Sequence, residues 1–205
     1  MTDVVRELEV NGGALVVDPP QRIPLLLRPA LYLAERLTGK EALPGRLLAH
    51  FPKGALGAGV LEATAAGGSD MSSPDGARVL AVARIVASTV AGCPFCIDMN
   101  AATWQRVGLT PAELDSLLAK DVSAARLDPR SAAAARYAAV LSATPVLLDV
   151  DLVVSLRALF TPREIVVLAT TIAQVNFWSR FSQGLGVPAA GFFDESACPV
   201  PPSPA

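Results

Sequence analysis

The chain has 205 residues, of which 52% are hydrophobic, 5% aromatic and 18% charged, and its net charge is −2. This near balance of acidic and basic side chains offers no basic surface to a phosphate backbone, so we expect no nucleic-acid partner. The longest apolar segments, 79–97 and 165–178, are interrupted by Arg84 or are shorter than the ~20 residues that span a bilayer, so we expect no membrane partner. The mean hydropathy of +0.44 indicates instead that apolar faces are buried between the subunits of a homo-oligomer.

The N-terminus and the cysteine count bear on location and cofactors. Residues 1–7 mix acidic and basic side chains and lack the pattern of a secretory signal peptide, so we expect a cytoplasmic protein. In the cytoplasm two neighbouring cysteines are more often catalytic, redox-sensing or metal-binding than a permanent crosslink. A structural zinc site needs four cysteine or histidine ligands, whereas the chain has 3 cysteines and 1 histidine. We therefore expect no metal and no cofactor.

Turn-forming residues and prolines divide the chain into three parts. Residues 1–24 contain two turn signals and are interpreted as an N-terminal arm that can lie on a neighbouring subunit. Residues 25–190 are expected to form a single helical domain. Residues 191–205, which include Cys198, form a tail that is too rich in proline for a helix.

Apolar residues recur with helical spacing through most of the central domain. Capping boxes at 110–113 and 161–164 each mark the start of a helix. No hairpin pattern follows residue 24, so the predicted fold class is all-α. A long apolar helix followed by a more polar one occurs at 79–109 and, in compressed form, at 165–187, which indicates an internal helix-pair repeat. In chain order, the expected helices span 24–37, 44–50, 55–66, 77–91, 94–107, 110–119, 131–142, 149–160 and 161–183.

The most informative motif is the pair Cys93 and Cys96, placed where an apolar run ends and a new helix is expected to begin. Pro94 suits the first position of that helix, which puts Cys93 at its cap and Cys96 in its first turn on the same side. The two sulfurs can then meet, and the unpaired N–H groups at the helix start favour a thiolate. Such a pair can attack a peroxide or a disulfide with one sulfur and resolve the product with the other.

With the apolar helix before it, the run at 92–100 resembles the alkylhydroperoxidase D-like group of the carboxymuconolactone decarboxylase superfamily. The segments 163–164, 176–180 and 184–187 are also similar to the second half of that superfamily, so the likeness covers about residues 25–190. The resemblance implies an all-helical, oligomeric fold. It also implies that Cys96 attacks the hydroperoxide and that Cys93 resolves the product as a disulfide, which a dithiol protein or a small thiol then reduces.

The chain departs from the family pattern on both sides of the motif. Redox-active members carry a histidine four residues after the second cysteine, where this chain has Asn100, and a glutamate about twelve residues before the first, near Ala81. Asn100 can hydrogen-bond Cys96 or a water molecule, which makes it a candidate site residue, but it cannot act as a base near neutral pH. General-base assistance typically supplies about 10²–10⁴-fold in rate, so we expect a slow peroxidase.

Three other side chains could accept the proton that the missing groups would take, namely His50, Glu62 and Asp98. Further along the chain, Asn176 and Trp178 interrupt an apolar helix and are expected to find polar partners on other helices or subunits. The predicted function is thiol-dependent reduction of a hydroperoxide or another small molecule. The alternatives are a lactone decarboxylase-like enzyme and a non-enzymatic redox-sensing oligomer.

Overall fold

The computed structural model describes residues 15–193, and every regular element in this part of the chain is a helix. The all-α fold class is therefore confirmed, and the internal repeat stays a prediction. The α-helices are α2 (Arg28–Thr38), α3 (Leu43–Leu48), α4 (Pro52–Ala63), α5 (Gly76–Ala91), α6 (Pro94–Ala101), α7 (Pro111–Leu118), α8 (Pro129–Ser142), α9 (Val150–Leu159) and α10 (Pro162–Gly184), with short 3-10 helices at Gly68–Asp70 and Trp104–Val107.

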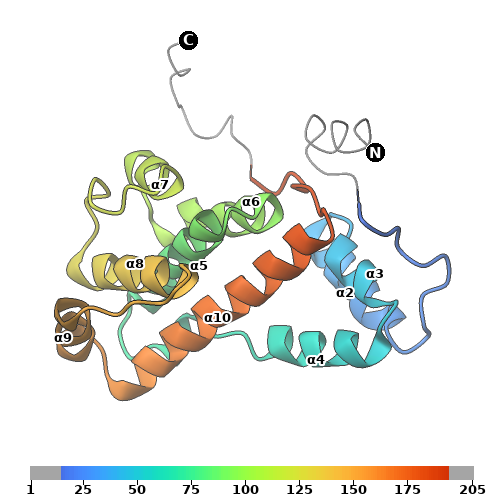
Figure 1. Cartoon of the computed structure of the whole chain (residues 1–205), viewed down its shortest axis with the longest axis horizontal. Helices are drawn as coiled ribbons and strands as arrows, with labels where there is room; N and C mark the ends of the chain where they lie inside the picture. The colour runs from blue at the N-terminus through green and yellow to red at the C-terminus, as the bar shows by residue number, and fades with distance from the viewer. Residues whose placement is uncertain (1–14, 194–205) are drawn as a thin grey trace, which may run out of the picture.

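The long helix α10 crosses the molecule obliquely, with α5 to α9 on one side and α2 to α4 on the other (Figure 1). The apolar helix α5 lies at the centre and packs most extensively against α8 and α10. Small side chains such as Ala83 and Ala134 let these helices approach closely, while Leu80 and Ile172 fill the space between them. None of the described helices is both long and apolar enough to span a membrane.

The largest difference between a predicted and an observed helix boundary lies at the end of α6. The sequence pattern predicts a continuous helix over 94–107, but α6 ends at Ala101 and a 3-10 turn follows at Trp104–Val107. The Thr103 hydroxyl donates to the Asn100 carbonyl at 3.1 Å, a bond that competes with the α-helical ladder. The chain then turns through Gly108 at φ 70°. This bend places Trp104 in the main core.

The described residues beyond the two ends of the central domain pack against it. Within the arm, the Val16 amide donates to the Leu185 carbonyl at 3.1 Å, and the Asp18 carbonyl lies 2.8 Å from Nε2 of His50. The described part of the arm therefore packs on its own chain. Residues 191–193 likewise pack on the domain, where the Phe193 amide donates to Asp98 at 2.7 Å. The rest of the arm and tail, including Cys198, lies outside the described residues.

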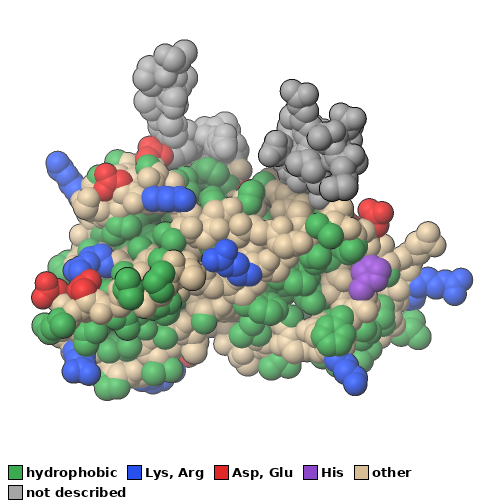
Figure 2. All heavy atoms as spheres, viewed as in Figure 1, with side chains coloured by type: hydrophobic (Ala, Val, Ile, Leu, Met, Phe, Trp, Pro, Cys, Tyr) green, Lys and Arg blue, Asp and Glu red, His purple; other side chains and the backbone are tan. Residues whose placement is uncertain are grey.

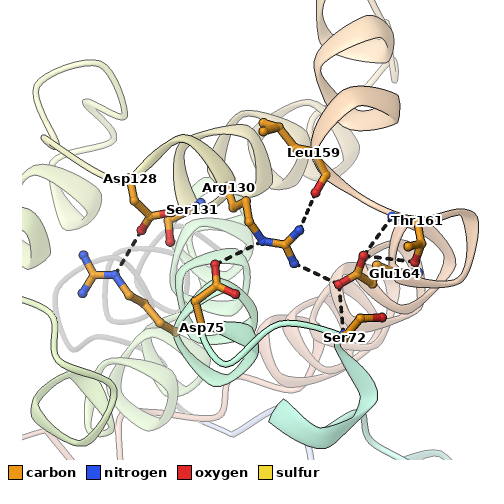
Figure 3. A network of polar contacts seen from close by, with 9 residues as sticks. Ser72, Asp75, Asp128, Arg130, Ser131, Leu159, Thr161 and Glu164 are labelled. Carbon is orange, nitrogen blue, oxygen red and sulfur yellow. Dashed lines mark hydrogen bonds and ion pairs between the residues drawn. The ribbon is translucent and has the colours of Figure 1, made fainter.

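A buried ion pair joins the starts of α8 and α10 (Figure 3). Nη2 of Arg130 lies 2.9 Å from Oε1 of Glu164, and Nε of Arg130 lies 3.1 Å from Oδ2 of Asp75. Glu164 also accepts backbone N–H bonds from Ser72 at 3.0 Å and from Thr161 at 2.8 Å, the latter within the predicted capping box. Burial of this carboxylate acts to raise its pKa, but these hydrogen bonds prevail and lower it to about 2.

We expect Glu164→Gln to lower the free energy of unfolding by about 2–3 kcal/mol, because it leaves Arg130 without its buried partner. The pKa of Glu164 is about 2 in the folded chain, against about 4.3 when unfolded. Its contribution is therefore fully present above the unfolded pKa and is lost as the pH falls through the folded pKa. Chemical denaturation at a series of acid pH values should show a steeper loss of stability in the wild type than in the variant.

Arg136→Gln is the matched control, because it removes an exposed ion pair of 3.6 Å with Asp149. Such pairs contribute less than about 1 kcal/mol. Equal losses for Glu164→Gln and Arg136→Gln would contradict a special role for the buried pair.

Candidate active site

The thiol pair lies where α5 passes into α6. Gly92 ends α5 at φ 69°, a left-handed conformation that suits glycine, and the chain reverses so that Cys93 caps α6 and Pro94 begins it. The Cys93 sulfur accepts the backbone N–H of Cys96 at 3.3 Å, and the two sulfurs lie 2.8 Å apart. Both cysteines are free thiols, with exposed fractions of 0% for Cys93 and 1% for Cys96. The expected meeting of the two sulfurs is thus present.

The two thiols have very different pKa values, mainly because of the hydrogen bond between them. A hydrogen bond from the Cys96 thiol lowers the pKa of Cys93 to about 7, aided by the backbone N–H groups of Cys96 and Phe95 and opposed by burial. The hydrogen bond to Cys93 and burial both raise the pKa of Cys96 far above its ordinary value. Near neutral pH the pair therefore loses one proton, and the proton that remains lies between two sulfurs.

An apolar cluster encloses the sulfurs. Leu47 of α3, Phe95 and Val187 are buried against them, and Trp178 and Phe181 of α10 pack on the same cluster. The Phe95 ring meets the ring of Phe192 edge to face, with centroids 6.1 Å apart. A site this poor in water strengthens each hydrogen bond to a charged sulfur.

Two serines of α10, Ser179 and Ser182, also border the pair. Both have exposed fractions of 0%. No partner stands at hydrogen-bond geometry from either hydroxyl. Even so, Ser179 lowers the pKa of both thiols and Ser182 that of Cys96. Helical spacing places the two serines on one face of α10, but the polar neighbours Asn176, Arg180 and Gln183 leave no signal in the sequence that singles them out.

Asp98, expected as a possible proton acceptor, has a structural role in this conformation. Its carboxylate accepts the backbone N–H of Ala190 at 2.8 Å and that of Phe193 at 2.7 Å. These two bonds hold residues 190–193 against α6, so that Phe192 closes over the thiol cluster. The segment acts as a cover of the sulfurs.

Asn100 and the two other candidate proton acceptors do not contact the sulfurs through any observed hydrogen bond. Asn100 donates to the backbone carbonyl of Cys96 at 2.8 Å, and His50 is exposed on the far end of α3 beside the arm. Glu62 accepts the Trp178 indole N–H at 3.0 Å and the Gln174 amide at 2.9 Å. Glu62 thus reaches the thiol cluster only through the indole ring of Trp178. No group of three metal-ligating side chains occurs among residues 15–193.

A largely apolar cavity of about 610 Å³ adjoins this cluster. Its floor includes Phe95, Trp178 and Phe192, which also pack around the sulfurs, and its walls come from α2, α3 and α4. Figure 2 shows apolar side chains gathered on the surface of this half of the molecule. Glu62 is one of its few polar lining groups. Neither cysteine lines the cavity, so the aromatic side chains separate it from the thiols.

The helical order and the paired thiols at the α5–α6 junction define a fold of the alkylhydroperoxidase D type. No family model and no curated protein matches the chain. Among solved structures it is similar to an alkylhydroperoxidase AhpD core, a peroxidase-related protein from Ralstonia eutropha JMP134, at 18% identity over 86% of this chain and 93% of that one, with a TM-score of 0.70. A peroxidase-related protein from Silicibacter sp. TM1040 gives 16% identity over 85% and 90%, with a TM-score of 0.68.

The debrominase Bmp8 has the same fold at 17% identity, over 86% of this chain and 93% of that one, with a TM-score of 0.70. A cysteine-to-alanine variant of Bmp8 has been crystallised with 2,3,4-tribromopyrrole. The expected fold is thus confirmed, and it is shared by uncharacterized peroxidase-related proteins and by a debrominase.

Asp98→Ala should open the cover of the thiols, because it removes both bonds that hold residues 190–193. One hydrogen bond to a charged group contributes about 1.5 kcal/mol. If the free energy of opening residues 190–193 falls by about that much, the population with the segment open rises about tenfold. The measurement is the rate at which a soluble disulfide reagent modifies Cys93 and Cys96 in a Cys198→Ser background. Asp151→Asn, an exposed acid on α9, is the control, and equal rates in both variants would show that Asp98 does not hold the cover.

Proposed function

We propose that the chain is a dithiol oxidoreductase that reduces organic hydroperoxides. The observation that carries this proposal is the sulfur–sulfur distance of 2.8 Å at a helix start, and the lowered pKa of Cys93 agrees with it. The apolar cavity beside the thiols favours an organic hydroperoxide over hydrogen peroxide. The two carboxylates that a lactone decarboxylase-like reaction would need as bases, Glu62 and Asp98, already accept structural hydrogen bonds.

The proposed reaction is a two-electron oxidation of the pair. Cys96 attacks the terminal peroxide oxygen, the O–O bond breaks, and Cys96 becomes a sulfenic acid while an alkoxide leaves. The alkoxide takes the remaining thiol proton from Cys93. The Cys93 thiolate then attacks the Cys96 sulfur and expels hydroxide, which takes up a proton equal to the one that the pair released to solvent on its first ionisation, so that two thiols and one hydroperoxide yield an alcohol, water and a disulfide. Closing the disulfide shortens the sulfur–sulfur distance from 2.8 Å to about 2.05 Å.

In this scheme Cys93 replaces the missing proton relay. As the resting thiolate it accepts the hydrogen bond of Cys96, so it can take the Cys96 proton as attack begins. Cys96 is then a thiolate of high intrinsic basicity, which makes it a strong nucleophile. Cys93 later gives that proton to the leaving alkoxide. Because one thiol performs both steps, turnover should be slow compared with enzymes that have a separate base.

Further turnovers need a reductant for the disulfide. We propose a dithiol protein or a small thiol in a reducing compartment such as the cytoplasm, because a thiolate partner can attack the disulfide by exchange. We also propose a homo-oligomer, because Leu33 and Leu37 at the edge of the cavity remain exposed in the single chain.

Cys93→Ser and Cys96→Ser should each abolish disulfide formation and multiple turnover with cumene hydroperoxide. A probe that traps sulfenic acids should label Cys96 in Cys93→Ser and leave Cys93 unlabelled in Cys96→Ser. Wild-type chain should lose two thiols for each hydroperoxide reduced, at a rate that rises with pH through about 7, where the pair loses its first proton. Cys198→Ser is the matched control. Turnover that survives in both single variants would remove the proposal, and labelling of Cys93 alone would reverse the two roles.

Reductive debromination is a second candidate, favoured by the shared fold with Bmp8 and by the apolar cavity. It uses the same two electrons. One thiolate takes bromine from carbon, the carbon takes a proton, and the second sulfur displaces bromide as the disulfide forms. Bromoarene and two thiols thus yield arene, hydrogen bromide and disulfide.

Incubation with 2,3,4-tribromopyrrole and a dithiol reductant distinguishes the two candidates. If debromination is the activity, the wild type should release bromide and Cys96→Ser should not, while cumene hydroperoxide should consume thiols no faster than in Cys96→Ser. Hydroperoxide reduction without bromide release would support the first candidate and exclude the second. Ion chromatography of bromide and a thiol titration give both measurements on one sample.

A further inference from the structure

Ser179 and Ser182 present two buried hydroxyls that the fold itself does not use. Both residues are fully buried, and neither hydroxyl has a partner at hydrogen-bond geometry. Two other buried serines of the central helices differ: the Ser88 hydroxyl donates to the Ile85 carbonyl at 2.9 Å, and that of Ser142 accepts from Asn176 at 2.9 Å. A buried hydroxyl without a partner costs about 1–3 kcal/mol. Two such groups three residues apart therefore need an explanation.

Their place in the fold supplies one. They lie on the stretch of α10 whose Trp178, Phe181 and Leu185 pack on the thiol cluster. The side chain of Gln183 fixes this stretch to the end of α5 by donating to the Ala91 carbonyl at 3.1 Å. The two serines therefore lie on the part of α10 that packs beside the sulfurs.

We propose that Ser179 and Ser182 are positioning residues that donate hydrogen bonds to the sulfurs when these carry negative charge. A serine side chain has three staggered χ1 rotamers, so each hydroxyl can turn toward a sulfur when it ionises. Ser179 lowers the pKa of both thiols and serves the charge on either of them, whereas Ser182 lowers that of Cys96 alone. This arrangement stabilises the negative charge as it moves from Cys93 to Cys96 during attack. The inference rests on the proposed dithiol chemistry and extends it.

The chemical requirement is a donor that cannot itself remove the charge. A histidinium or a carboxylic acid beside the pair would compete for the single proton that the two sulfurs share. A serine hydroxyl does not ionise in this range, so it stabilises the anion and leaves the proton between the thiols. A charge-assisted hydrogen bond of this kind is about twice as strong as a neutral one.

The test is a pH titration of the full chain carrying Cys198→Ser. The first thiol ionisation is monitored by the ultraviolet absorbance of the thiolate. Ser179→Ala should raise the transition by about one pH unit or more, since one charge-assisted hydrogen bond is lost. Ser182→Ala should raise it by less. At a pH above this transition, Ser179→Ala destabilises the reduced, thiolate form of the pair. The equilibrium constant with a dithiol reductant should therefore shift about tenfold toward the disulfide, which corresponds to a change of about 30 mV in reduction potential.

Ser131→Ala is the matched control, because Ser131 is equally buried and its hydroxyl also lacks a partner, but it lies at the start of α8. It should change neither the titration nor the equilibrium. If Ser179→Ala fails to fold, Ser182→Ala decides the question by the same measurements. The inference would be overturned if Ser179→Ala and Ser182→Ala both titrated as the wild type does, or if Ser131→Ala shifted the titration equally.

Neither measurement uses a substrate. If Ser179→Ala shifts the titration but the wild type does not reduce hydroperoxide, the role of the serines is retained and the proposed function is rejected. If the wild type reduces hydroperoxide but neither serine variant shifts the titration, the proposed function is retained and the role of the serines is rejected.

Discussion

The position of α10 is the constraint on which the rest of the structure depends. Its first turn is fixed by Glu164, which joins Arg130 and two backbone N–H groups in a buried network. From there an α-helix rises about 1.5 Å per residue, so Ser179 lies about 22 Å further along a rigid rod. The rod packs on α5 and α8 before it reaches α6. An ion pair at one end of the domain thereby sets where the hydroxyls and aromatic rings meet the thiols at the other.

At the thiol site, two opposing effects act on the same charge. Burial disfavours a thiolate, whereas the start of α6 and the Cys96 thiol favour it, and the balance leaves the pKa of Cys93 at about 7. The same enclosure lowers the effective dielectric constant, so each donor that remains has a larger effect. The cover held by Asp98 therefore does more than exclude solvent, because it also sets how strongly the thiolate is stabilised.

Local signals made most helices predictable. The capping boxes at Thr110 and Thr161 form as expected, and the cysteines meet because both lie in one helical turn. What depends on distant parts of the chain was not predictable in the same way. The sequence offers Asp98 as one of three possible proton acceptors, and its partners in the structure are backbone groups 92 and 95 residues away. Ser179 and Ser182 became visible only when the rotation of α10 was known, because helical spacing shows which residues share a face and not what that face meets.

The chemistry proposed for the thiol pair applies to both candidate reactions. Reduction of an O–O bond and reduction of a carbon–bromine bond both need two electrons and a site that tolerates a transient negative charge on sulfur. The dithiol supplies the electrons in either case, and donors such as Ser179 stabilise the charge without regard to the atom attacked. Selection between substrates then falls to the apolar cavity and to the aromatic side chains between it and the sulfurs. Because these side chains belong to α6, α10 and the covering segment, the substrate can change while the helices that hold the cysteines stay the same.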